Sequence, residues 1–124
     1  MELAICLPIL VAVGFGMIET CNVVFVKARL QSAAFESVRL ATRPTTATNL
    51  AATAPQVQAS CNTLLTQLGV QGATVVISPS SLANLAPQTL VTVTISAPFS
   101  QNSVTSMVVS KSLAVSASAT MIIE

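Results

Sequence analysis

The side chains that could do chemistry in this 124-residue chain are few, and most of them lie near its start. The chain has no His, and its four acidic residues are all Glu, so a catalytic triad, a His-containing metal site and a paired-Asp site are excluded. With a net charge of +1, a strongly basic nucleic-acid binder is excluded as well. We therefore expect a protein that is not an enzyme and needs no cofactor. The charged residues are Glu2, Glu19, Glu36, Glu124, Lys27, Arg29, Arg39, Arg43 and Lys111.

Three cysteines supply the remaining reactive groups. Cys6 lies in an apolar run and is expected to be a buried thiol. Cys21 and Cys61 are a candidate disulfide pair, within one subunit or between two. An intrachain bond would be strained, because Cys21 precedes Leu30 by nine residues and so faces about 180° away from the stripe expected to meet the second helix. The sequence has no CxxC motif and no Gly-rich phosphate loop, so haem, iron–sulfur, zinc and nucleotide sites have no support.

Residues 3–18 form an uncharged apolar run that would span about 24 Å as a helix. A secretory signal peptide needs a basic start, whereas Glu2 opens this run. A buried core helix would need a larger partner than the rest of the chain provides. A membrane anchor that continues into a longer helix fits best.

The continuation of this helix is visible in residues 23–43, which contain no Pro or Gly. Apolar residues recur there at three- and four-residue steps, and Pro44 ends the pattern. We predict one helix of about 40 residues and about 60 Å, with Pro8, Gly14 and Gly16 as candidate kinks. The predicted stripe consists of Val23, Val26, Leu30, Ala34, Val38 and Ala41.

The charges around the apolar run conflict with the character of the chain that follows it. Lys27 and Arg29 come after the run and no base precedes it, which by the positive-inside rule would keep the rest of the chain in the cytoplasm. That remainder is rich in Ser and Thr and poor in charge, as an exported domain would be. We therefore expect that a basic leader has been removed from the N-terminus.

Residues 44–124 are predicted to form a head, separate from an N-terminal helical unit at 1–43. After a polar linker at 44–53, a helix is expected at 54–68, with Thr53 as N-cap and Gly69 as terminator. A segment rich in β-branched residues at 73–78 and alternating segments at 89–97 and 113–123 predict strands. The expected fold class is α+β: a long N-terminal helix and one further helix packed on a three-stranded antiparallel sheet. The inward positions of the last two strands would be Val91, Val93 and Ile95, then Leu113, Val115, Ala117, Ala119, Met121 and Ile123.

These segments together resemble a known family. The opening MELAICLPILVAVGFGMIE, the stretch KARLQSAAFESVRLAT, the strand VTVTISAPFS and the ending LAVSASATMIIE look like TadE-like pilins. The resemblance implies a bacterial type IV pilin-like protein with a pilin-like long helix. Such proteins are made as precursors, held in the inner membrane, cleaved by a prepilin peptidase and assembled into surface filaments.

The resemblance also suggests assembly roles for four residues. Glu2 matches the family's glutamate near the cleavage site, and in a filament its partner would be the α-amine of a neighbouring subunit; alternatively it serves only as a favourable charge at the helix N-terminus. Glu19, Lys27 and Arg29 either form ion pairs between subunits or are solvated charges just above the bilayer.

The leading functional hypothesis is a structural pilin-like subunit that polymerises through its N-terminal helix into an extracellular filament. Its expected partners are identical subunits, inner-membrane lipid before assembly, the prepilin peptidase and the pilus assembly machinery. One alternative is a minor or priming pilin retained in a membrane assembly complex. Another is a membrane-anchored module whose head binds a surface.

Overall fold

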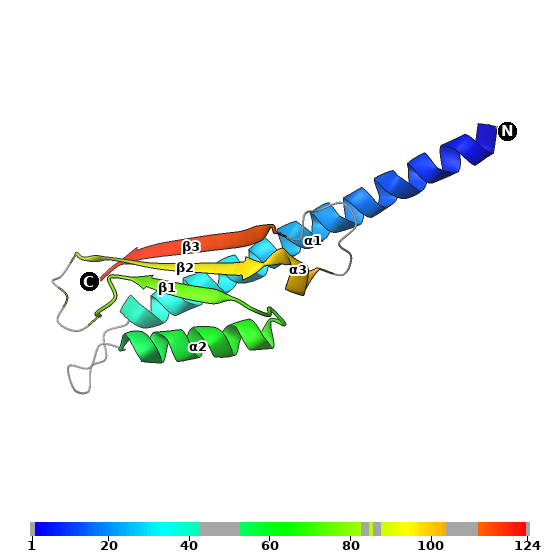
Figure 1. Ribbon diagram of the computed structural model, residues 1–124. Coiled ribbons are helices and arrows are strands. Elements are labelled where there is room, and N and C mark those ends of the chain that lie inside the picture. Colours follow the sequence, from blue (N-terminus) through cyan, green and yellow to red (C-terminus); the bar gives the residue numbers. More distant parts are fainter. Residues whose placement is uncertain (1, 43–52, 83–84, 86–87, 104–111, 124) are drawn as a thin grey trace.

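A computed structural model describes residues 2–42, 53–82, 85, 88–103 and 112–123 (Figure 1). Its elements are α1 (Glu2–Thr42), α2 (Ala54–Gln67), β1 (Thr74–Ser78), β2 (Leu90–Pro98), α3 (Phe99–Asn102) and β3 (Ala114–Ile122). The predicted α+β class, with a long first helix and a three-stranded antiparallel sheet, is confirmed. The expected helix stop at Pro44 and nearly all of the 44–53 linker lie outside the described residues, as do Lys111 and Glu124.

The second helix begins and ends where its capping residues predict. Thr53 has an extended backbone, and its N–H donates to the Gln56 side-chain oxygen at 3.1 Å. Pro55 lies in the first turn, where a missing N–H is not needed. At the other end Gly69 has a φ of +70°, and the Val70 N–H donates to the Leu65 carbonyl at 2.9 Å. This glycine cap reverses the chain into β1.

The sheet is an antiparallel meander in the order β1-β2-β3. Alternate residues of β2 point inward, and Val91, Val93 and Ile95 are completely buried, as predicted. In β3 the prediction holds for the central positions Val115, Ala117 and Ala119.

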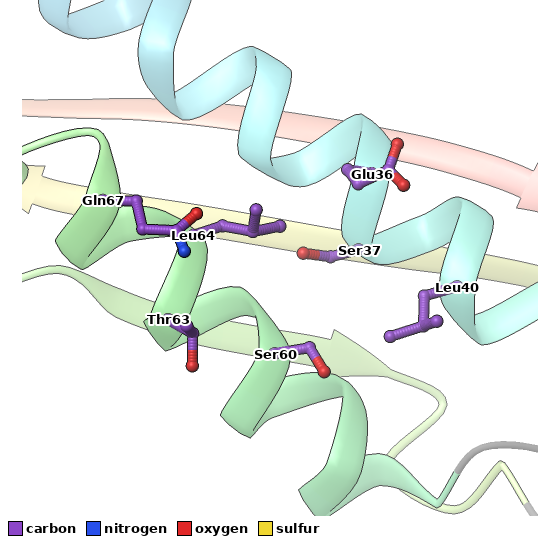
Figure 2. Close-up of a pocket in the computed structure, with 7 residues that line it drawn as sticks. All are labelled: Glu36, Ser37, Leu40, Ser60, Thr63, Leu64 and Gln67. Atoms are coloured by element: carbon purple, nitrogen blue, oxygen red, sulfur yellow. The ribbon is translucent and has the colours of Figure 1, made fainter.

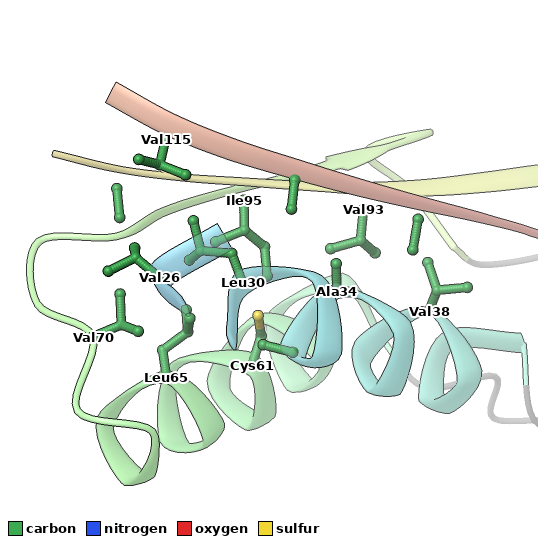
Figure 3. Close-up of a cluster of buried hydrophobic side chains, with 14 of the residues drawn as sticks. Val26, Leu30, Ala34, Val38, Cys61, Leu65, Val70, Val93, Ile95 and Val115 are labelled. Carbon is green, nitrogen blue, oxygen red and sulfur yellow. The ribbon is translucent and has the colours of Figure 1, made fainter. Parts of the chain in front are cut away.

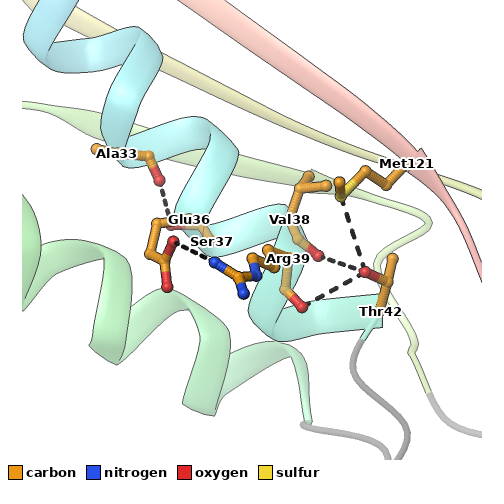
Figure 4. Close-up of polar contacts among 7 residues, drawn as sticks. All are labelled: Ala33, Glu36, Ser37, Val38, Arg39, Thr42 and Met121. Carbon is orange, nitrogen blue, oxygen red and sulfur yellow. Dashed lines mark hydrogen bonds and ion pairs between the residues drawn. The ribbon is translucent and has the colours of Figure 1, made fainter.

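The inward alternation of the last strand fails at its ends, where Leu113 and Met121 are exposed. Figure 4 shows Met121 beside Thr42 in the last turn of α1, with the Thr42 hydroxyl 3.9 Å from the Met121 sulfur. Met121 thus lies level with the end of α1, and the helix no longer covers it.

The first helix contributes more residues to the main hydrophobic core than any other element, and α2 and the sheet supply most of the others (Figure 3). The second half of α1 packs on β2 and β3, and α2 packs beside α1 and near β1. Leu30, Ala34 and Val38 of α1 are completely buried in one cluster with Cys61 of α2 and Ile95 of β2. The core therefore crosses the boundary that the sequence predicts between residues 43 and 44.

A short helix, α3, was not predicted from the sequence. It follows directly from β2 and buries Phe99. The side chain of Asn102 ties this turn to the loop before β1: its oxygen accepts from the Gln71 N–H at 2.7 Å, and its nitrogen donates to the carbonyls of Gln71 and Pro98 at 2.9 Å. These three bonds join the turn after β2 to the loop before β1 at one end of the sheet.

Candidate functional site

The most distinctive surface of the molecule is the first half of α1, which projects beyond the head (Figure 1). We call residues 3–18 the arm. Its large apolar side chains are exposed in every direction; Leu3 is 80% exposed, Leu10 69% and Met17 65%. Monomeric soluble proteins rarely expose a continuous apolar surface of this kind. By length and composition α1 could cross a membrane.

The helix runs without a break through the three positions where a kink was expected. Pro8, Gly14 and Gly16 all lie within α1, and the helical assignment is continuous from Glu2 to Thr42. A Cβ on either glycine would meet nothing within 4 Å. Both glycines therefore have open space beside them in the single chain.

The acidic residues expected at the two ends of the arm have different surroundings. Glu2 begins α1, and its side chain lies outside the described part. Glu19 is only 1% exposed and lies on the same helical face as Val26 and Leu30. The side chain of Glu19 is therefore buried within its own chain, and its role in assembly stays a prediction.

The two bases after the arm lie on different sides of α1. Lys27 is exposed. Arg29 is half-buried, with its guanidinium carbon 4.4 Å from the centre of the Phe25 ring. A Cβ on Gly69 would lie 3.8 Å from the Arg29 side chain, so the guanidinium also reaches the C-terminal end of α2. A cation at a helix C-terminus is favourable, which gives Arg29 a role within the head. Assembly roles for Glu2, Lys27 and Arg29 stay predictions.

The three thiols are free and lie in different environments. Cys21 is exposed on α1, whereas Cys61 is buried between α1 and the sheet, so the structure does not pair them. Burial raises the pKa of the Cys61 thiol, although a hydrogen bond with Ser37 partly opposes the shift. Cys6 is exposed in the single chain, so its expected burial would require another molecule.

A groove of about 320 Å³ lies between α1 and α2 (Figure 2). Its lining mixes hydroxyl groups with Leu40 and Leu64, and Glu36 is its charged member. The Ser37 hydroxyl donates to the Ala33 carbonyl at 2.7 Å, and Glu36 lies 3.9 Å from Arg39 at the surface (Figure 4). The hydroxyls of Ser37 and Thr63 donate to carbonyls of their own helices and Glu36 is directed to Arg39, so this groove does not suggest a reaction.

The sequence analysis missed one feature of the second half of α1. Val24, Phe25 and Phe35 are large, apolar and exposed, although this stretch was expected to be polar away from the head. The signal that could have revealed Val24 and Phe35 is their spacing in steps of four, three and four residues, on a different face from the predicted inward stripe.

Comparison with known proteins agrees with this picture of the first helix. Residues 1–39 match the TadE-like protein family. No curated protein and no solved structure matches the chain. The family match covers the arm and most of the head-attached part of α1, which are the segments that carry the exposed apolar surface.

Proposed function

Because residues 1–39 are TadE-like, we propose that this chain is a structural pilin-like subunit that polymerises through α1 into an extracellular surface filament. The observation that carries the proposal is the arm, a straight run of helix whose apolar side chains its own head leaves uncovered. Each large aliphatic side chain removed from water contributes about 1.5–3 kcal/mol. Such a surface needs a partner, first lipid and then the helices of other copies.

The arm suits both of these environments. It carries no charge between residues 3 and 18, so it can stay in the inner membrane of a bacterium until assembly. The same uncharged surface packs against equivalent helices once it leaves the lipid. The TadE-like family implies a Tad pilus context, and the further partners of the chain would be a prepilin peptidase and the pilus assembly machinery.

Glu2 would supply the polar contact in this apolar core. A carboxylate buried among packed helices costs several kcal/mol unless a positive group accompanies it. The α-amine of a neighbouring subunit would be that group. We expect Glu2→Ala to stay inserted in the membrane and to reduce filament assembly; a normal filament yield from this variant would remove the role assigned to Glu2.

The experiment is electron microscopy of sheared cell-surface material, with mass spectrometry of any filaments. Abundant copies of this chain support the proposal, whereas trace amounts would indicate a minor or priming pilin. Leu10→Lys places a charge in the arm, and Ser118→Lys places the same charge on the exposed face of β3. Filaments should be lost in the first variant and kept in the second.

Solution conditions give an independent test of the same proposal. At about 1 M salt the Debye length falls to about 3 Å, which weakens exposed ion pairs and leaves apolar packing intact. Filaments should persist in high salt and dissociate in detergent. Dissociation in salt with survival in detergent would contradict a core made of apolar helices.

A further inference from the structure

The half of α1 that carries the head has a second apolar face, directed away from the head. At 100° per residue, Val24, Ala28 and Phe35 lie roughly opposite Leu30, the centre of the buried face. Val24 is 62% exposed and Phe35 51%, and Ala28 is exposed as well. This face therefore has no role in the core of its own head.

The exposed apolar residues on this face follow a heptad spacing. Their steps along α1 are 3, 4, 3 and 4 residues, with one polar member, Gln31. Such alternation of three and four residues brings side chains to one line on which a second helix packs with a left-handed supercoil. We call this line the outer seam; its members in the head-attached half are Cys21, Val24, Ala28, Gln31 and Phe35.

The outer seam continues in register into the arm. From Cys21 backwards the steps are 4, 3, 4, 3 and 4 residues. Because the arm is apolar all round, its seam positions alone would mean little. The continuity is informative because the head-attached half, unlike the arm, is not apolar on all sides. The charged residues Lys27 and Glu36 lie on either side of the seam there, and neither belongs to it. The members in the arm are Leu3, Leu7, Leu10, Gly14 and Met17.

We propose that the outer seam of the head-attached half binds the arm of a second copy, as a parallel helix pair offset by three heptads. This rests on the proposed function and names its interface. An offset of 21 residues, about 31 Å, brings the open Gly14 beside the bulky Phe35 and Leu7 beside the small Ala28. At these two positions a large side chain meets a small one, whereas Leu3 meets Val24 and Leu10 meets Gln31.

The proposed helix pair is also compatible with the position of the head on each subunit. Each head lies on the far side of its own α1 from the outer seam, so two paired helices keep their heads apart. The 41 residues of α1 are close to twice the proposed offset. A third copy can therefore follow the first along the same line without overlap, which makes the contact open-ended and suited to a filament.

Cysteine cross-linking tests the seam and its register. In a chain with Cys6→Ala and Cys21→Ala, Leu7→Cys with Ala28→Cys creates two thiols too far apart on one helix to join within a chain. The matched control is Ile9→Cys with Ala28→Cys, since Ile9 (61%) and Leu7 (59%) are equally exposed but Ile9 lies off the seam. A register control keeps Cys21 and adds only Leu7→Cys, which reports an offset of two heptads. None of the substituted residues is buried.

Oxidation in membranes and in sheared filaments should give a ladder of multimers for the 7/28 chain, on the order of tenfold stronger than for the 9/28 chain or the 7/21 chain. Equal ladders, a stronger 7/21 ladder, or cross-links only to a different protein would overturn the proposal. The two proposals fail separately. Filaments without a preference for 7/28 contradict the seam, whereas a 7/28 ladder without filaments supports the seam and contradicts the filament function.

Discussion

The two halves of α1 differ in what covers them, although they form one continuous helix. In the head-attached half, the inward residues Leu30, Ala34 and Val38 are completely buried by α2 and the sheet. In the arm, Leu3 and Leu10 are the most exposed large hydrophobic residues of the described chain. One helix therefore has two halves with different partners. Its own head covers one half, and only another molecule can cover the other.

The boundary between these halves lies near Glu19. Below it, residues 3–18 are uncharged and apolar on all sides, as in a helix that needs partners all round. After Glu19, the apolar residues of α1 that face the head form one narrow stripe, and the outer seam forms a second one. We therefore propose that the folding unit of the head is residues 20–124 rather than 44–124.

Removing the head-attached half of α1 should have the largest effect. A fragment of residues 44–124 loses Leu30, Ala34 and Val38 from the core and should not fold cooperatively. A fragment of residues 20–124 keeps them and should show a cooperative thermal transition by circular dichroism. A folded 44–124 fragment would show instead that the head is independent of α1.

Truncation of a single side chain should have a smaller effect than removal of the helix. The loss of folding stability should nevertheless differ clearly between the two halves of α1. Leu30→Ala removes a completely buried side chain and should lower the free energy of unfolding by about 2–5 kcal/mol. Leu10→Ala, in the exposed arm, should change it by no more than about 0.5 kcal/mol. Denaturant unfolding of the full chain in mild detergent measures both. Similar losses would mean that the arm also contributes to the stability of the single subunit.

A small effect is also expected for the surface charges of α1. Glu36 and Arg39 are 3.9 Å apart and well exposed, so Glu36→Gln should cost about 0–1 kcal/mol of folding stability. Unfolding curves at low and high salt provide the measurement. A larger loss would indicate that this exposed pair within α1 stabilises the helix by more than such pairs usually do.

Much of the fold could be predicted because local signals agree with the tertiary structure. Thr53, Pro55 and Gly69 mark α2, and the alternation of Val91, Val93 and Ile95 marks the central strand. The burial of Glu19 could not be predicted, since a carboxylate at the end of an apolar run gives no sign of which face meets the head. The role of Asn102 could not be predicted either, because two of its three bonds join it to Gln71, which lies 31 residues away in the sequence.

The candidate site was predicted in outline and missed in detail. The composition of residues 3–18 alone identifies them as apolar. The rest of the chain is too short to cover a helix of that length. The outer seam was not predicted, because the inward stripe already accounted for the apolar periodicity of residues 23–43. Only the observed burial separates the two stripes, by assigning Leu30 to the core and leaving Phe35 exposed.

The central claim is that copies of this chain cover the arm in a filament, and the thiol of Cys6 tests it most directly. Cys6 is exposed in the single chain, whereas Cys61 is buried with a raised pKa, so it holds little reactive thiolate and should label slowly. In a Cys21→Ala background, maleimide should leave Cys6 unlabelled in intact filaments and label it fully after dissociation in detergent. A Ser118→Cys control on the exposed face of β3 should label in both states. If Cys6 labels as fast as that control in intact filaments, the arm is not covered by other copies and the account is wrong.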